Sequence, residues 1–125
     1  MKALITGGAG FIGSHTAEAL LTRGLEVRIL DSLEARVHPG GWPAWLPSAC
    51  ELVRGDVRDR PALAAALDEV EVVYHFAAYQ DYLPDFSRFF DVNATGTALI
   101  YELLLERRLP VRKVIVASSQ AAAGE

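Results

Sequence analysis

The stretch TGGAGFIG, residues 6–13, decides the fold because it joins two runs of different periodicity. Residues 2–6 form a short apolar run that is typical of a β-strand. From Ile12 to Arg23, small and apolar residues recur at the three- and four-residue spacings of an amphipathic helix. The sequence therefore predicts a strand, a glycine-rich turn and a helix at the start of the chain.

The glycines of this turn suit the binding of a dinucleotide. Gly7, Gly10 and Gly13 have the spacing G-x-x-G-x-x-G. Glycines allow a tight left-handed bend, a close approach of the backbone to a ligand, and close packing of helix on strand. The helix N-terminus then offers free N–H groups and a partial positive charge to a pyrophosphate. A purely structural turn is the alternative, but the order of strand, turn and helix favours dinucleotide binding.

Asp31 supplies a second sign of a dinucleotide site. It ends the apolar run EVRILD and follows the glycine turn at the distance expected for the acid that binds the adenosine ribose. A carboxylate accepts hydrogen bonds from the ribose hydroxyls and repels a 2′-phosphate. We therefore expect NAD to be preferred over NADP, although Arg36 is close enough in sequence to leave NADP open.

Further apolar runs alternate with helical patterns along the rest of the chain. The runs lie at residues 26–30, 51–54, 70–76 and 112–118, with helical patterns at 59–67 and 91–108. Strands that are apolar on both faces and alternate with helices predict an α/β domain with a doubly wound parallel sheet, the Rossmann fold. We predict about five strands with helices on both faces, and a single NAD-binding domain over residues 1–125.

Residues 32–49 interrupt this alternation. Prolines and glycines surround Trp42 and Trp45, so we predict a long loop or insertion. The two tryptophans can pack on the domain or face a ligand.

Composition excludes several classes of protein. Hydrophobic residues make up 51% and charged residues 22%, a balance typical of soluble globular chains. No apolar run approaches the roughly 20 residues that cross a bilayer, so we expect a cytoplasmic protein without membrane contact. The net charge of −4 with scattered basic residues disfavours nucleic acid. With one cysteine and three histidines at unsuitable spacing, we expect no metal.

Six motifs in order resemble those of the extended short-chain dehydrogenase/reductase family, and more narrowly its NAD-dependent nucleotide-sugar epimerases and dehydratases. They are TGGAGFIG, Asp31, GDVRD at 55–59, HFAA at 75–78, VNATGT at 92–97 and SS at 118–119. The matches span nearly the whole chain.

The resemblance implies a set of NAD-binding residues. Phe11 and Ile12 would lie by the pyrophosphate, Asp56 and Val57 by the adenine, and residues 76–78 by the nicotinamide. Asn93 would orient the neighbouring strand and helix, whereas we expect His75 to be structural. The full implied set is Gly7, Gly10, Phe11, Ile12, Gly13, Asp31, Ser32, Asp56, Val57, Phe76, Ala77, Ala78 and Asn93.

The resemblance also implies a chemistry, hydride transfer between a sugar carbon and the nicotinamide. Ser119 would be the catalytic residue that holds the reacting hydroxyl, beside a tyrosine base with a lysine four residues later. None of the four tyrosines has such a lysine, and Ala123 stands where the family usually has a further tyrosine. We expect that the chain is truncated before the substrate domain. By itself it should bind NAD weakly and turn over no sugar.

Several functional alternatives remain open at this point. A 4-epimerase acting on a dTDP- or UDP-sugar is favoured for the complete enzyme. A non-catalytic NAD-binding sensor or interaction module, and half of a split enzyme, are the alternatives. By analogy with the family, residues 91–108 could form a homodimer. The aromatic residues between positions 79 and 90 could belong to the core or face a sugar nucleotide; they are Tyr79, Tyr82, Phe86, Phe89 and Phe90.

Overall fold

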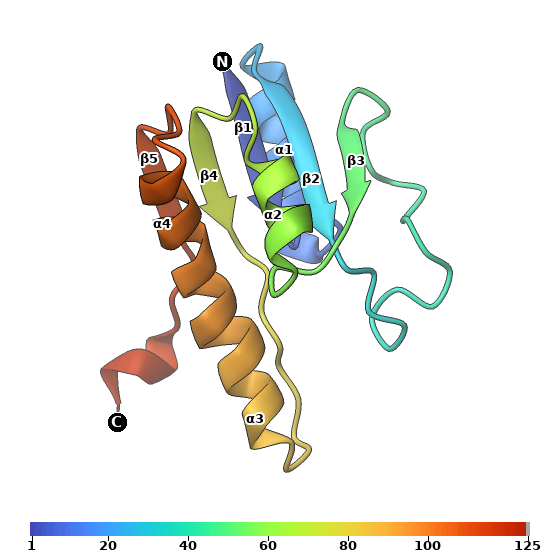
Figure 1. Ribbon diagram of the computed structural model, residues 1–125. Helices are drawn as coiled ribbons and strands as arrows, with labels where there is room; N and C mark the ends of the chain where they lie inside the picture. The colour runs from blue at the N-terminus through green and yellow to red at the C-terminus, as the bar shows by residue number, and fades with distance from the viewer. Residues whose placement is uncertain (125) are drawn as a thin grey trace.

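A five-stranded parallel sheet forms the centre of the computed structural model, which describes residues 1–124 (Figure 1). The predicted domain range extends to Glu125, which lies outside the described residues. The strands are β1 (Lys2–Thr6), β2 (Glu26–Asp31), β3 (Glu51–Arg54), β4 (Val72–His75) and β5 (Lys113–Val116). Their order is β3-β2-β1-β4-β5, and every pairing is parallel. This order confirms the predicted doubly wound sheet.

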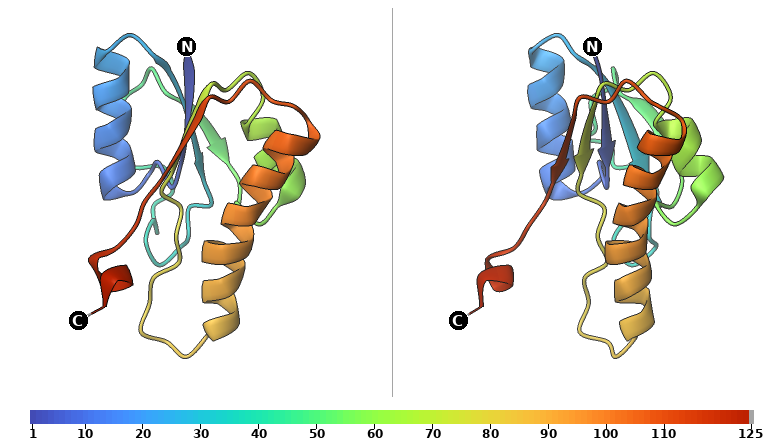
Figure 2. Two further views of the ribbon diagram at one scale, coloured as in Figure 1. Left: turned by 90° about the vertical axis from the view of Figure 1, so that its left-hand side faces the viewer. Right: turned by 60° about the vertical axis from the view of Figure 1, so that its left-hand side comes forward.

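Helices cover both faces of the sheet. Figure 2 shows α1 (Phe11–Thr22) on one face, with α2 (Arg60–Ala66) and α4 (Gly96–Glu106) on the other. Asp59 caps α2, accepting a hydrogen bond from the Ala62 N–H at 3.2 Å, and Pro61 occupies the first turn. The predicted cap and helix are therefore present.

The core has two parts because alternate residues of the central strand point to opposite faces. Ala3 and Ile5 pack towards α1, whereas Leu4 packs towards α2 and α4. Ile100 and Leu103 of α4 are fully or almost fully buried against the second face. This double burial explains why the strands are apolar without alternation.

Arg28 of β2 ties the end of α2 to the sheet. Its guanidinium donates from Nη1 to the Ala66 and Asp68 carbonyl oxygens, both at 2.8 Å, and its Nε lies 2.9 Å from Glu51 Oε2. The helix therefore ends with an arginine on its free carbonyl groups, where a positive charge is favourable.

The predicted helix at 91–108 is wrong at its start. The helical segment begins at Phe86 as α3 (Phe86–Phe89), continues through the π-helical η1 (Phe90–Thr95) and runs into α4. In Figure 1 this segment extends beyond the sheet. Phe86 and Phe90 are exposed, so the first part of the helical segment has no buried face and no helical spacing of apolar residues. The sequence pattern therefore predicted only the part of the helix that packs on the sheet.

The connections after β1, β2, β3 and β4 leave the same edge of the sheet because the strands are parallel. Residues 32–49 contain neither helix nor strand, as predicted. Trp42 packs against the core on the α1 face, whereas Trp45 is 71% exposed. After β5 the chain moves away from the sheet and ends in the short 3-10 helix η2 (Gln120–Ala123) (Figure 2).

Candidate functional site

The glycine turn brings three backbone segments into direct contact. Gly7 has a φ of +67°, and an ideal Cβ on it would lie 2.7 Å from the Ala77 backbone nitrogen. A Cβ on Gly13 would lie 2.5 Å from the Gly7 carbonyl oxygen. A side chain at Gly7 or Gly13 would therefore disrupt the contact between the turn, α1 and the segment after β4.

Gly10 differs, because among the described residues, apart from its neighbours in the chain, only the Gly7 oxygen lies within 4 Å of its ideal Cβ, at 3.3 Å. It lies at the N-cap of α1, where helical N–H groups lack partners in the preceding turn. The backbone at Gly10 is thus left uncovered by protein at the positive end of a helix, as a bound phosphate requires.

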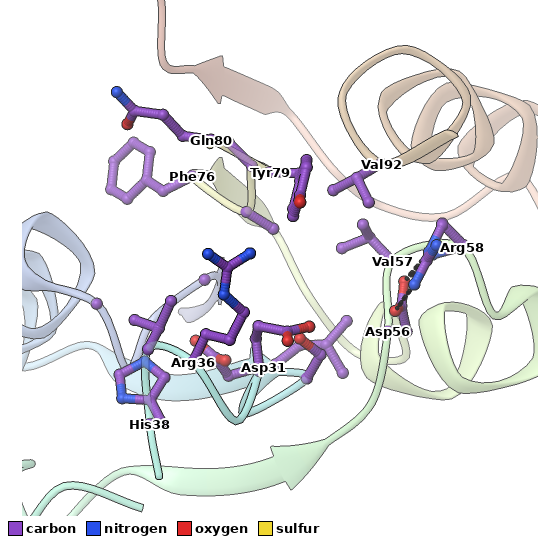
Figure 3. A pocket seen from close by; sticks show the side chains of 18 of the residues that line it. Asp31, Arg36, His38, Asp56, Val57, Arg58, Phe76, Tyr79, Gln80 and Val92 are labelled. Atoms are coloured by element: carbon purple, nitrogen blue, oxygen red, sulfur yellow. Dashed lines mark hydrogen bonds and ion pairs between the residues drawn. The ribbon is translucent and has the colours of Figure 1, made fainter. Parts of the chain in front are cut away.

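A pocket of about 340 Å³ lies across the carboxyl ends of the strands (Figure 3). This edge is where doubly wound sheets bind ligands. Nine of the thirteen cofactor residues implied by the sequence line it: Gly7, Gly10, Asp31, Ser32, Asp56, Val57, Phe76, Ala77 and Ala78. These residues come from four separate connections, so the fold assembles them.

Asp31 is held by backbone groups on both sides. Its Oδ2 accepts from the Ala9 N–H at 3.0 Å, and its Oδ1 accepts from the Leu33 N–H at 2.9 Å. The residue is only 9% exposed. Each carboxylate oxygen keeps a further lone pair, so the carboxylate is fixed in orientation and can still accept from ligand hydroxyls.

Asp56 is paired with a neighbouring arginine. Arg58 donates to it from Nε at 2.9 Å and from Nη2 at 2.7 Å, and the Arg58 backbone N–H donates to Oδ1 at 2.8 Å. The Arg58 side-chain hydrogen bond lowers the pKa of this carboxyl group, so it is ionised at neutral pH. Asp56 therefore closes a local turn with its own backbone and lines the pocket at the same time.

A buried hydrogen-bond chain supports the wall of the pocket formed after β4. His75 Nδ1 lies 2.7 Å from the Thr6 hydroxyl oxygen, and its Nε2 lies 2.8 Å from the Thr97 hydroxyl oxygen. Thr97 donates its proton to the Asn93 carbonyl oxygen, so its oxygen accepts from His75 Nε2. Nδ1 then accepts from Thr6. Burial lowers the pKa of His75, which keeps the ring neutral in this arrangement.

The same chain fixes the backbone that lines the pocket. The Phe76 and Ala77 N–H groups both donate to the Thr6 hydroxyl oxygen at 3.2 Å. Asn93, within the π-helical turn, accepts from the Tyr79 N–H at 2.7 Å and donates to the Tyr79 carbonyl at 3.0 Å. Thr6, His75 and Asn93 thus position residues 76–79 without lining the pocket themselves.

Sequence reasoning missed the charged pairs that join the pocket walls. Arg88 pairs with Glu34, and Arg36 pairs with Asp81. The first pair links the loop after β2 to α3, the second links that loop to the segment after β4, and all four side chains line the pocket. No local motif signals such pairs, since their members lie about fifty residues apart in the sequence.

Tyr79 lies in the same wall, with the Arg88 guanidinium 4.4 Å above its ring. Its hydroxyl donates to the Asp85 carboxylate, and this hydrogen bond raises the pKa of Tyr79. The phenol is therefore protonated at neutral pH.

The structure does not bring every expected residue to the pocket. Phe11 and Ile12 lie at the start of α1 and are 81% and 62% exposed, with Phe11 lining a second hollow together with Trp45. Ser119 is exposed, and its hydroxyl oxygen accepts from the Ala121 N–H at 3.1 Å as the N-cap of η2. The pocket is therefore lined by nine of the predicted cofactor residues but not by Ser119.

The aromatic residues left open by the sequence do not form a core. Tyr82, Phe86 and Phe90 are 101%, 69% and 71% exposed. Tyr79 and Phe89 pack edge to face with their ring centroids 4.9 Å apart. Within residues 1–124, no helix is both long and apolar enough to span a bilayer, and no three potential ligand residues group as a metal site.

Comparisons with known proteins give one consistent family. The NAD dependent epimerase/dehydratase family matches residues 3–125. The dTDP-L-rhamnose 4-epimerase of Burkholderia thailandensis is 34% identical over 99% of the chain, and a UDP-glucose 4-epimerase of Klebsiella pneumoniae is 34% identical over 100% of it. The crystal structure of Thermus thermophilus UDP-glucose 4-epimerase with NAD superposes on 95% of the chain with a TM-score of 0.81 and 37% identity.

The lengths of these proteins differ from that of the chain. The chain spans 36% of the Burkholderia protein, 94% of the Klebsiella protein and 38% of the Thermus structure. The similarity to the longer proteins therefore concerns little more than a third of each.

Proposed function

Because the chain belongs to the NAD-dependent epimerase/dehydratase family, we propose that its pocket binds NAD and forms the cofactor site of a nucleotide-sugar epimerase or dehydratase. One observation carries this proposal. The buried Asp31 carboxylate is held at the pocket between the glycine turn and the loop after β2 while keeping free lone pairs.

The residues present fit the parts of the dinucleotide. The uncovered backbone at Gly10 and the start of α1 suit the pyrophosphate, and Asp31 suits the ribose hydroxyls. Asp56, Val57 and residues 76–78 line the pocket, and we propose that the first two lie beside the adenine and the last three beside the nicotinamide. NAD supplies the hydride acceptor when bound, while these residues orient it and the Thr6–His75 chain keeps the wall in place.

For the reaction, we favour 4-epimerisation of a dTDP- or UDP-sugar. Two relatives that are each 34% identical carry the names dTDP-L-rhamnose 4-epimerase and UDP-glucose 4-epimerase. Ser119 would hold the substrate hydroxyl in that reaction. The 125 residues contain no tyrosine with a lysine four positions later, so this chain alone binds the cofactor without turnover.

A homodimer is supported by the outer surface of the helical segment. Phe90, Tyr101 and Leu105 are 71%, 45% and 80% exposed, and we propose that a second copy covers them. Sedimentation of the chain and of a Leu105→Glu variant tests this. A dimer formed by the unaltered chain but not by the Leu105→Glu variant would support the homodimer. A monomer in both samples would refute it.

Calorimetric titration with NAD tests the cofactor site. Asp31→Asn keeps the shape of the side chain and removes its charge, and Asp68→Asn is the matched control because Asp68 is exposed and lies outside the pocket. Hydrogen bonds to a charged group contribute about 1.5–3 kcal/mol, so Asp31→Asn should weaken binding by about tenfold or more. Equal affinities in the two variants would refute the role of Asp31. Incubation with UDP-glucose and NAD tests turnover, and measurable UDP-galactose would refute the claim of inactivity.

A further inference from the structure

Arg36 is an arginine that lines the pocket, and arginine is the residue type that accommodates NADP in dinucleotide sites. It lies on the loop that follows Asp31, and Figure 3 shows its guanidinium reaching towards the segment after β4. In dinucleotide sites an arginine at this place accommodates the 2′-phosphate that an aspartate repels. Asp31 and Arg36 therefore favour opposite cofactors.

The structure shows Arg36 already bound. Its Nη1 pairs with Asp81 Oδ2, and the Tyr82 N–H donates to the other Asp81 oxygen at 2.7 Å. The Asp81 side chain is 17% exposed, against 54% for Arg36. The hydrogen bond from Tyr82, together with the charge of Arg36, lowers the pKa of Asp81. The carboxylate is thus ionised, and it is held by a hydrogen bond from its own segment as well as by the ion pair with Arg36.

The other two arginines of the pocket wall are also neutralised. Arg58 is paired with Asp56, and Arg88 with Glu34. Asp31 differs from these acids, because the hydrogen bonds it accepts come from backbone N–H groups. Among the described residues that line the pocket, every arginine is therefore paired with a carboxylate. Asp31, at the proposed ribose position, is the acid that has no arginine partner.

We propose that Asp81 is a specificity-determining residue that acts through Arg36. By holding the guanidinium, it prevents Arg36 from offsetting the repulsion between Asp31 and a 2′-phosphate, so the pocket takes NAD rather than NADP. This inference rests on the proposed function, since it requires that NAD bind with its adenosine ribose at Asp31.

A double-mutant cycle with two cofactors tests the proposal. Affinities for NAD and NADP are measured by calorimetry for the unaltered chain, Asp81→Asn, Arg36→Met and the double variant. An exposed ion pair contributes up to about 1 kcal/mol, so release of Arg36 should raise NADP affinity relative to NAD by about threefold to fivefold. The gain should disappear in the double variant and should shrink at high salt, because the freed arginine acts through its charge.

Each outcome distinguishes this proposal from the function on which it rests. Retained NAD affinity in Asp81→Asn shows that the variant is folded. An unchanged ratio of NADP to NAD affinity in Asp81→Asn would overturn the role of Asp81. A gain in NADP affinity that persists in the double variant, which lacks Arg36, would also overturn it, because the gain would then come only from the loss of the repelling charge of Asp81. An unaltered chain that binds neither cofactor would refute the proposed function itself, and with it this inference.

Discussion

Substitution of Gly7 tests how the strand, the turn and the pocket wall are joined. In Gly7→Ala the new methyl group would lie 2.7–2.9 Å from backbone atoms of Ala77 and Phe76. Gly24→Ala is the matched control. Gly24 has a similar positive φ, +79° against +67°, but within residues 1–124 no atom beyond its chain neighbours lies within 4 Å of its ideal Cβ.

The expected cost has two parts. A non-glycine residue in the left-handed region costs about 1–2 kcal/mol, and both variants bear this cost. Only Gly7→Ala adds overlap with backbone, which must shift at the expense of the Ala77 hydrogen bond to Thr6. Overpacking of this kind costs about 1–3 kcal/mol, and a lost buried hydrogen bond about 1 kcal/mol. We therefore expect Gly7→Ala to be less stable than Gly24→Ala by about 2–4 kcal/mol.

Urea denaturation monitored by circular dichroism measures both free energies of unfolding under identical conditions. The denaturation midpoint of Gly7→Ala should be clearly lower than that of Gly24→Ala, with similar slopes. Losses that agree within about 0.5 kcal/mol would show that only the positive φ matters. The close packing of the turn against residues 76 and 77 would then contribute nothing to stability.

Three further predictions concern other parts of the structure. Burial lowers the pKa of His75 from its ordinary value of 6.5, so the unfolded state binds the proton more readily than the folded state. The free energy of unfolding should therefore fall as the pH drops below 6.5, by up to about 1.4 kcal/mol per pH unit. His75→Gln should flatten this part of the profile of unfolding free energy against pH. Arg28→Met removes the donor to two carbonyl groups at the end of α2, so it should lower the free energy of unfolding by about 2–3 kcal/mol in thermal or urea denaturation. The control Arg23→Met, at an exposed site, should lower it by less than about 0.5 kcal/mol. Equal losses would contradict the role of Arg28 at the helix end. Asn93→Ala removes both hydrogen bonds to the Tyr79 backbone, so the Tyr79 amide should exchange with solvent about fivefold to tenfold faster; an unchanged rate would mean that the wall does not depend on Asn93.

The sequence was sufficient where local chemistry decides the structure. The glycine turn, the Asp59 cap and the runs of apolar residues each have a physical cause within a few residues, so the five strands and their parallel arrangement could be predicted. The helix start at Phe86 could not, because that part of the helix packs on no sheet and leaves no hydrophobic period.

The site was predictable to the extent that short motifs define it. The glycines, Asp31 and residues 76–78 lie at strand ends, where the fold collects side chains. The ion pairs of the pocket wall join residues about fifty positions apart, and their choice of partner follows from the folded positions of two loops. The orienting role of the Thr6–His75–Thr97 chain likewise needed the register of β1 against β4.

The most direct test of the account is a two-dimensional ¹H–¹⁵N NMR titration of the 13.6 kDa chain with NAD. The account predicts that chemical shift changes concentrate on the amides around the pocket and saturate together, leaving distant positions such as Gly24 unchanged. The responding amides should be those of Gly7, Gly10, Asp31, Asp56, Val57, Ala77 and Ala78. A spectrum unaltered by millimolar NAD, or changes confined to residues outside this pocket, would contradict the assignment of a cofactor site.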